Sequence, residues 1–200
     1  MIYRLAFDLS QRWLLARRNR YLAGKFDPSS KIADLGSGNN PFKDAQVCID
    51  KFDSDNVQRG GRPIKHLNGK ELRNVDLNKY PYPFENKELD FVICSHLLEH
   101  LDDPLAACRE ISRIARSGYI EVPAFSSDIF MRPNDRIHKW LCLHDSSMGL
   151  LFFLDRRSFL KRAGPSLLPI WTRFFLSLKV TRLLWKGQIR AEYLSSESWR

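Results

Sequence analysis

The chain has 200 residues, of which 44% are apolar and 12% aromatic, so it can bury the core of one α/β domain of ordinary size. Its four cysteines are scattered without a C-x-x-C pair, which argues against a disulfide framework and against a structural zinc site. The start of the chain lacks the charged and then apolar pattern of a signal peptide, so we expect a reducing, cytoplasmic setting.

The net charge of +9 lies in the two flanks of the chain. Residues 1–25 carry six basic and one acidic side chain, and residues 166–200 carry six basic and two acidic ones, while residues 26–165 are neutral. We therefore predict a basic amphipathic helix over 1–25, a ligand-binding domain over 26–165, and a basic amphipathic extension over 166–200 that packs on the domain or continues it.

Both flanks interleave large apolar side chains with Arg and Lys. Such a pattern can lie on an anionic membrane, where each basic group contributes about 1 kcal/mol. For residues 1–25 the simpler interpretation is a helix that packs on the sheet, whereas for 166–200 peripheral contact with the inner membrane face stays open. A spanning helix is disfavoured, because Arg173, Lys179 and Arg182 interrupt the most apolar stretch. Nucleic acid is disfavoured as a partner, because no recognisable binding module accompanies the charge.

The first half of the chain shows short apolar runs that end in polar turns. Strands are predicted at 31–35, before a tight turn over 36–41, and at 45–50, where Asp50 closes the run. A weaker strand is expected near 72–77. The continuous apolar run over 89–95 suits a strand covered on both faces, and therefore the centre of the sheet.

A helix is predicted next, with Asp103 as N-cap and Pro104 at its first position. Gly118 is expected to end this helix before a strand at 119–122, which completes a βαβ unit. The apolar face of the predicted helix comprises Leu105, Cys108, Ile111, Ile114 and Ala115. Further on we expect a polar and aromatic stretch over 125–139, a strand at 149–154, and helices at 158–163 and 167–185.

This order of elements predicts an α/β fold: a Rossmann-like, doubly wound and mostly parallel sheet with helices on both faces. In such sheets ligands bind outside the carboxyl ends of the strands. Gly36, Asp50, Asp76 and Ser95 are therefore expected on one rim. Glu121 is unusual inside a strand, and it either faces the cleft or pairs with an arginine.

The sequence Asp-Leu-Gly-Ser-Gly at 34–38 follows the first predicted strand. Glycines there let the main chain approach a ligand without an intervening Cβ. A dinucleotide-binding fingerprint needs a third glycine where Pro41 stands, so a NAD-dependent oxidoreductase is not supported.

Over about residues 30–123 the chain resembles the class I S-adenosylmethionine-dependent methyltransferases. DLGSG at 34–38 resembles their first motif, Asp50 their ribose-binding acid, and LDFVICSHLLEHLDDP at 89–104 the fourth strand and the residues after it. The resemblance extends loosely through GYIEVPA at 118–124 and IHKW at 137–140. It departs from the family after Gly38, where Asn39, Asn40 and Pro41 replace a further glycine.

The resemblance implies S-adenosylmethionine as cofactor and a role for each matching residue. Gly36 and Gly38 would pass close to the methionine moiety, Asp34 would hold its ammonium, Asp50 the ribose hydroxyls, Asp76 the adenine amine and the backbone of Leu77 the ring edge, and Ser95 and His96 would line the floor beneath the sulfonium. These roles require the glycine turn and the Asp50 carboxylate to converge on one cleft.

His96, Glu99 and His100 match the H-x-x-E-H pattern of inverted zinc peptidases. That site needs both histidines on one helix, facing the metal. Here His96 directly follows a predicted strand, so we expect no metal.

If the acceptor is a hydroxyl, a general base assists the reaction, and histidine is the usual choice near neutral pH. We name His138 as the first candidate catalytic residue and His100 as the second. The predicted function is methyl transfer by in-line displacement to a small-molecule, saccharide or lipid-linked acceptor. The alternative is a protein of the same fold that binds the cofactor or acts as a scaffold without catalysis. The sequence does not indicate an oligomeric state.

Overall fold

The computed structural model describes residues 13–38, 40–51, 69–131, 137–163 and 179–195. The chain divides into two compact units, Met1–Ser30 and Lys31–Arg200. In the first unit residues 13–22 are helical, and the guanidinium of Arg17 lies 4.3 Å from the ring centroid of Trp13. The predicted helix over 1–25 is thus confirmed for 13–22, and residues 1–12 lie outside the described part.

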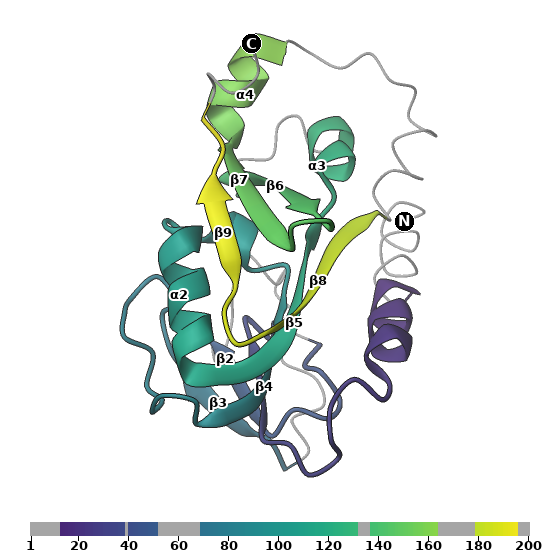
Figure 1. Ribbon diagram of the computed structural model, residues 1–200, viewed down its shortest axis with the longest axis vertical. Coiled ribbons are helices and arrows are strands. Elements are labelled where there is room, and N and C mark those ends of the chain that lie inside the picture. Colours follow the sequence, from purple (N-terminus) through teal and green to yellow (C-terminus); the bar gives the residue numbers. More distant parts are fainter. Residues whose placement is uncertain (1–12, 39, 52–68, 132–136, 164–178, 196–200) are drawn as a thin grey trace, which may run out of the picture. The chain divides into compact units, whose positions relative to one another are not determined.

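The second unit contains a six-stranded sheet in the order β3-β2-β1-β4-β5-β8 (Figure 1). Pairing is parallel from β3 to β5, and β8 runs antiparallel to β5. The predicted Rossmann-like, mostly parallel sheet is confirmed. Its strands are β1 (Ile32–Leu35), β2 (Val47–Asp50), β3 (Glu71–Asn74), β4 (Leu89–Ser95), β5 (Ala115–Pro123) and β8 (Val180–Lys186).

A smaller sheet lies next to the first in the order β6-β7-β9 (Figure 1). Strands β6 (Trp140–Asp145) and β7 (Leu150–Asp155) are antiparallel, and β9 (Arg190–Tyr193) runs parallel to β7. The helical elements are the short 3-10 helix η2 (Leu98–His100), α2 (Pro104–Ile114), α3 (Phe125–Met131) and α4 (Arg156–Ala163). Within the described residues no helix is long and apolar enough to cross a membrane.

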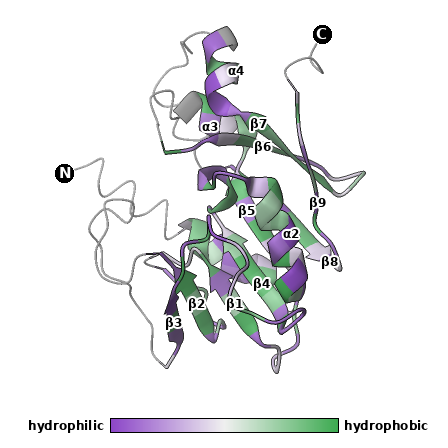
Figure 2. Cartoon of the chain, turned by 90° about the vertical axis from the view of Figure 1, so that its left-hand side faces the viewer, coloured by the Kyte–Doolittle hydropathy of each residue, from purple (hydrophilic) through white to green (hydrophobic). Residues whose placement is uncertain are grey.

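The central position of β4 follows from its continuous apolar sequence. β4 pairs with β1 on one side and β5 on the other, and Phe91–Cys94 are all buried. Figure 2 shows β4 as mainly hydrophobic, whereas the edge strand β3 is mainly hydrophilic. A strand buried on both faces cannot alternate apolar and polar residues, which is why this run could be assigned from sequence.

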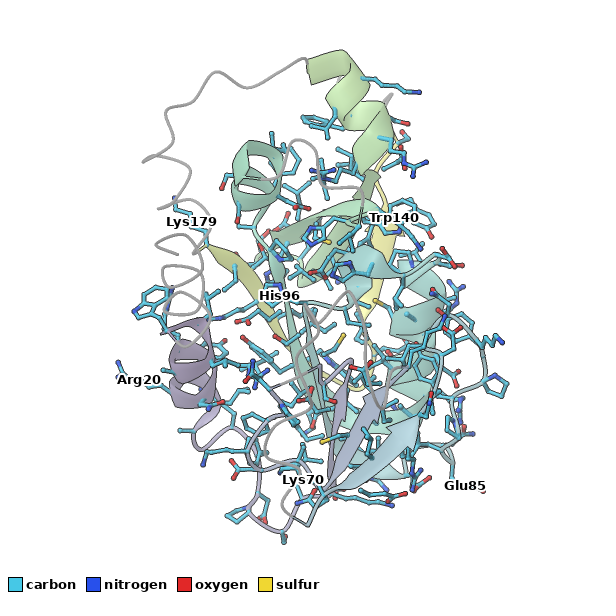
Figure 3. The ribbon with its side chains drawn as sticks, turned by 180° about the vertical axis from the view of Figure 1, so that it is seen from behind. Arg20, Lys70, Glu85, His96, Trp140 and Lys179 are labelled. Atoms are coloured by element: carbon cyan, nitrogen blue, oxygen red, sulfur yellow. The ribbon has the colours of Figure 1, made fainter. Side chains whose placement is uncertain are left out.

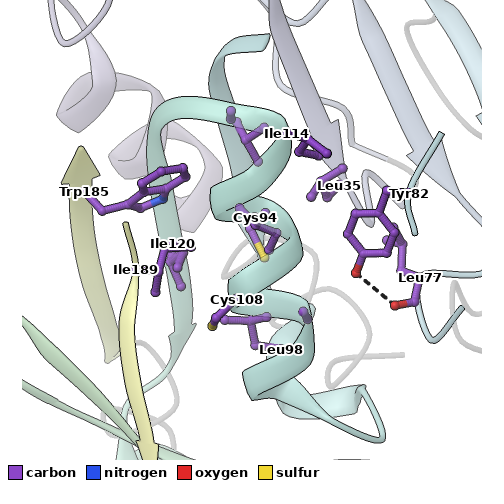
Figure 4. Close-up of a cluster of buried hydrophobic side chains, with 14 of the residues drawn as sticks. Leu35, Leu77, Tyr82, Cys94, Leu98, Cys108, Ile114, Ile120, Trp185 and Ile189 are labelled. Carbon is purple, nitrogen blue, oxygen red and sulfur yellow. Dashed lines mark hydrogen bonds between the residues drawn. The ribbon is translucent and has the colours of Figure 1, made fainter. Parts of the chain in front are cut away.

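Helix α2 begins as the sequence predicts. Asp103 is its N-cap and accepts a hydrogen bond from the N–H of Ala106 at 2.8 Å, while Pro104 occupies the first turn. The apolar face of α2 packs on the sheet, where Cys108 and Ile114 join one buried cluster with Cys94 (Figure 4). All four cysteines of the chain are free and buried.

The prediction that Gly118 ends this helix is wrong. The helix ends at Ile114, and β5 starts at once and runs through Gly118. A Cβ on Gly118 would lie 2.5 Å from the carbonyl oxygen of Val92 and 2.9 Å from the ring of Trp185. The glycine is therefore used for close packing inside a strand, which local sequence cannot distinguish from a helix end.

The predicted helix over 167–185 is wrong for its described part, residues 179–185; residues 164–178 lie outside the described part of the chain. Val180–Lys186 forms β8, which pairs along the edge of β5. This pairing satisfies backbone groups of β5 that would otherwise be exposed at the edge. Strand β6 falls outside the predicted elements, and α3 forms within the polar and aromatic stretch over 125–139, for which no helix was predicted.

Candidate functional site

Parallel pairing brings three of the predicted site residues to one level of the sheet. The last residue of β1 pairs with Ile49 of β2 and with Cys94 of β4. The residues that follow on these strands, Gly36, Asp50 and Ser95, therefore stand side by side, with Gly36 in the middle. The predicted rim at the carboxyl ends is confirmed for these three positions.

The turn after β1 is built from two glycines in the left-handed region, with φ of 65° at Gly36 and 57° at Gly38. The N–H of Gly36 donates to the carbonyl oxygen of Ile49 at 2.7 Å, which folds the turn against β2. A Cβ on Gly36 would lie 3.0 Å from Leu97 Cδ1. A Cβ on Gly38 would have, among the described residues, only the Gly36 carbonyl oxygen within 4 Å. The main chain at Gly38 is thus accessible to a ligand on that side.

Asp50 and the glycine turn converge. The N–H of Gly38 donates a hydrogen bond to Oδ2 of Asp50 at 2.8 Å, and Asp50 is half-buried at the end of β2. The geometry that the predicted ribose site requires is therefore present. The contact of Asp50 with a ribose itself stays a prediction.

Asp34 lies beneath the loop that continues from this turn. It is 1% exposed, and its Oδ2 accepts a hydrogen bond from the N–H of Phe42 at 2.6 Å. This bond attaches the far end of the loop to β1. A contact between Asp34 and an ammonium group stays a prediction.

Asp76 follows β3. The preceding residue, Val75, donates its N–H to the carbonyl oxygen of Asp50 at 3.1 Å. Its Oδ2 lies 3.0 Å from Nζ of Lys51, and its Oδ1 accepts from the N–H of Asn78 at 3.1 Å. The hydrogen bond from Lys51 lowers the pKa of Asp76, so this side chain is a carboxylate at neutral pH.

Leu77 is buried next to this carboxylate. Its carbonyl oxygen accepts a hydrogen bond from the hydroxyl of Tyr82 at 2.9 Å (Figure 4). The ring of Tyr82, which is only 2% exposed, therefore orders the segment predicted to meet adenine.

Ser95 takes part in a buried network around Glu121, which is 2% exposed. The hydroxyl of Ser95 donates to Oε1 of Glu121 at 3.1 Å, while Oε2 accepts from the hydroxyl of Tyr119 at 2.5 Å and from Nε of Arg182 at 2.9 Å. Burial raises the pKa of Glu121, but the charges and donors around it outweigh burial, and the pKa lies below its usual range. Of the two sequence interpretations of Glu121, the structure shows pairing with an arginine.

His96 lies where the six-stranded sheet meets the β6–β7 layer (Figure 3). Its backbone is left-handed, with φ of 55°, and its N–H donates to the carbonyl oxygen of Glu121 at 2.7 Å. Its side chain is 40% exposed, with Nδ1 3.3 Å from Oε1 of Glu99. His96 and His100 are thus not two positions of one α-helix, as a zinc peptidase site would need.

The two candidate catalytic histidines contact each other. Their ring centroids lie 4.6 Å apart in an edge-to-face arrangement. His138 is 6% exposed, and its Nδ1 lies 2.6 Å from Oδ1 of the buried Asp128. The side chain of His100 is 30% exposed, and its Nδ1 lies 3.4 Å from the carbonyl oxygen of Ile137. Burial lowers the pKa of His100, which favours the neutral imidazole.

Sequence reasoning missed Asp128. It considered Glu99, which is completely buried on η2, only in the rejected zinc-peptidase pattern and as a candidate base ranked behind the histidines. Asp128 and His138 are ten residues apart, and this spacing is not characteristic of any sequence motif. A groove between α2 and β9, lined in part by Arg109, Gln188 and Arg190, contains none of the site residues.

A family model for a methyltransferase domain matches residues 52–120. Among solved structures, a chain of the complex between the Haloferax volcanii Trm112 methyltransferase activator and a protein assigned as a methyltransferase aligns over 92% of this chain and 93% of its own, with a TM-score of 0.52 and 14% identity. The matched segment lies within the part of the chain that resembles methyltransferases in sequence, and the fold agrees with that resemblance. At this identity the structural likeness establishes the fold, not the substrate.

Two further solved structures align over shorter stretches. The YcgJ protein of Bacillus subtilis aligns over 64% of this chain and 61% of its own (TM-score 0.46, 15% identity). An S-adenosylmethionine-dependent methyltransferase of Thermotoga maritima aligns over 60% and 59% (TM-score 0.42, 17% identity). The alignments thus span less than two thirds of either protein. No curated protein matches the chain by sequence.

The methyltransferase match covers the described strands β3 and β4, helix α2 and most of β5. It does not include the glycine turn or Asp50. The match and the geometry at the ends of β1 and β2 are therefore separate observations on the same domain.

Proposed function

We propose that the chain binds S-adenosylmethionine at the carboxyl ends of β1, β2 and β4 and transfers its methyl group to a small-molecule, saccharide or lipid-linked acceptor. The observation that carries the proposal is the convergence of Gly38 with Asp50, joined by a hydrogen bond of 2.8 Å. It supports the proposal because a nucleoside with a polar tail needs an acceptor for its hydroxyls beside exposed main chain.

The residues present fit this cofactor. The side of Gly38 on which a Cβ would stand meets only the carbonyl oxygen of Gly36, at 3.9 Å, among the described residues. Asp50 would hold the ribose hydroxyls, and the main chain at Gly36 and Gly38 would lie along the methionine portion. Asp34 would act from beneath the loop, either on the ammonium or by holding the loop through Phe42.

The opposite end of the nucleoside would lie near β3. The Asp76 carboxylate would accept a hydrogen bond from the adenine amine, with Lys51 as its fixed counter-ion, and the backbone of Leu77 would meet the ring edge. Ser95, at the end of β4 next to Gly36, and His96, which follows the strand, would form the floor below the sulfonium. The hydrogen bond from Ser95 to Glu121 fixes that floor to β5.

When bound, S-adenosylmethionine supplies a methyl group on a sulfonium, which is a good leaving group, so positioning and exclusion of water can account for much of the rate. For a hydroxyl acceptor, His100 would accept the proton, since it is the more exposed of the two histidines. His138, which Asp128 holds in place, would orient His100 through their ring contact.

Isothermal titration with S-adenosylmethionine tests the proposal. We expect binding to the wild type that is weakened by about 1–3 kcal/mol in Asp50→Ala, the scale of a hydrogen bond to a charged group. Asp44→Ala is the matched control, since this carboxylate precedes β2 and forms a surface ion pair with Lys43. Absence of binding to the wild type would contradict the proposal, and equal binding to folded Asp50→Ala would contradict the ribose assignment. Binding without turnover on any acceptor would favour the cofactor-binding scaffold.

A lipid-linked acceptor is included because of the charge distribution. The excess of basic residues in 1–25 and 166–200 would draw the protein to an anionic membrane face. Most of the apolar residues of these flanks lie outside the described part of the chain, so this component of the proposal rests on sequence.

A further inference from the structure

Glu99 is a completely buried carboxylate surrounded by imidazoles. Its exposed fraction is 0%, and neither carboxylate oxygen accepts a hydrogen bond of good geometry from a described residue, although Nδ1 of His96 lies 3.3 Å from Oε1. A buried charge without compensation costs several kcal/mol, so such a group is normally paired or bound to a cation. Glu99 therefore calls for a positive partner.

Two histidines stand next to this carboxylate. One ligand atom from each of Glu99, His100 and His138 lies within 4.8 Å of the others. Nε2 of His100 is 3.9 Å from Oε1 of Glu99. The three residues come from η2 and from the segment that leads into β6, so the tertiary fold assembles them.

The second nitrogen of each ring faces a hydrogen-bond acceptor. Nδ1 of His138 lies 2.6 Å from the Asp128 carboxylate, and Nδ1 of His100 lies 3.4 Å from the carbonyl oxygen of Ile137. An imidazole that donates from Nδ1 carries its lone pair on Nε2. Metal-binding histidines are commonly oriented in this way, by a carboxylate or a backbone carbonyl on the other nitrogen.

We propose that Glu99, His100 and His138 bind one divalent transition-metal ion, best matched by Zn²⁺, through one carboxylate oxygen and the two Nε2 atoms. Two imidazoles and a carboxylate are a donor set that zinc accepts, with a fourth position left for water or a ligand. Bonds of about 2.0–2.2 Å require the three atoms to approach one another, each moving by less than about 1 Å.

A protonated His96 is the competing explanation. Its Nδ1 lies 3.3 Å from Oε1 of Glu99, and it would neutralise the carboxylate without a metal. The two explanations predict different metal binding. If His96 is the sole counter-ion of Glu99, the protein should not bind one equivalent of metal at this cluster.

The metal proposal is independent of S-adenosylmethionine binding. A bound metal would, however, occupy the lone pair that His100 needs in order to act as a base.

Titration of the chelator-treated full chain with Co²⁺, followed by its visible absorption, tests the site. We expect one equivalent to bind, Zn²⁺ to displace it, and the spectrum to lack a thiolate charge-transfer band, because the ligands are nitrogen and oxygen. Glu99→Gln and His100→Ala should lose this binding. His144→Ala is the matched control, because this histidine of β6 is outside the cluster, and it should bind like the wild type.

A second variant keeps the test informative if a ligand variant fails to fold. Asp128→Asn retains the shape of the side chain that orients His138, and it should weaken Co²⁺ binding about 10–100-fold, as loss of an orienting partner does elsewhere. Sub-stoichiometric binding to the wild type, or equal binding to folded Glu99→Gln, would overturn the proposal in favour of His96. Titration with S-adenosylmethionine in the presence of chelator reports separately on the cofactor site.

Discussion

Glu121 and Arg182 stand directly opposite each other on β5 and β8, and Nε of Arg182 donates to Oε2 of Glu121 at 2.9 Å. Their side chains are 3% and 16% exposed, so the pair is largely shielded from water. The same carboxylate holds Ser95 next to the glycine turn. This pair therefore links the antiparallel edge of the sheet to the floor of the proposed cofactor site.

Removing one partner should leave a buried charge. We expect Arg182→Ala to lower the free energy of unfolding by about 3–5 kcal/mol, the usual cost of an uncompensated buried ion. Urea denaturation of the wild type and the variant measures this change in the free energy of unfolding. Arg116→Ala is the control, since the exposed pair of Arg116 with Asp90 should contribute at most about 1 kcal/mol. Equal losses of unfolding free energy in the two variants would contradict the expectation that the buried pair stabilises the fold more than the exposed pair.

Gly118 should not tolerate a methyl group. A Cβ there would lie 2.5 Å from a backbone oxygen and 2.9 Å from the Trp185 ring, and the backbone cannot move without shifting β4 or β8. We predict that Gly118→Ala destabilises the domain by about 1–3 kcal/mol or more, as overpacking does. Thermal unfolding followed by circular dichroism measures the change. A melting temperature equal to that of the wild type would contradict the packing seen at this position.

The N-cap of α2 predicts a pH-dependent effect. The hydrogen bond from the N–H of Ala106 is the main cause that lowers the pKa of Asp103. A carboxyl with a lowered folded-state pKa stabilises the fold above its unfolded pKa of about 3.9, and this contribution is lost as the pH falls through the folded value. Asp103→Ala should therefore cost about 0.5–2 kcal/mol near neutral pH and progressively less below about pH 4.

Asp102→Ala is the control for this cap. Asp102 is the exposed neighbour of Asp103, it pairs with Lys139 at the surface, and it caps no helix. Its substitution should change the free energy of unfolding by less than about 1 kcal/mol. Denaturant titrations at several pH values compare the two variants. A loss in Asp103→Ala that stays constant down to pH 3 would contradict the electrostatic origin of the cap.

Membrane association is tested by charge reversal. Deleting 166–200 is unsuitable, because it would remove β8 and β9 from their sheets. Arg12→Glu combined with Arg173→Glu should reduce sedimentation with phosphatidylserine vesicles about tenfold or more, since each basic group contributes about 1 kcal/mol. Lys161→Glu reverses an exposed charge of α4 outside both flanks and should have a smaller effect. Equal binding by wild type and double variant would exclude a membrane role for these residues.

The sequence by itself determined the elements whose signals are local. The apolar run of β4 and the Asp103–Pro104 start of α2 are each encoded within a few residues, and the parallel order then places Gly36, Asp50 and Ser95 on one rim. The turn at Gly36 and Gly38 is also predictable from the local sequence, because a tight turn after a strand often requires a backbone conformation that favours glycine.

Only the tertiary structure decided the contacts between distant segments. The local sequence at Gly118 predicts a helix end, whereas in the structure this glycine packs against Trp185. The local sequence of Val180–Lys186 predicts a helix, whereas in the structure this segment pairs with the edge of β5. Glu121 finds Arg182 across 61 positions of sequence. Such contacts depend on which surfaces meet after folding, and free energy gained by burial and pairing there exceeds the weak local preference of the chain.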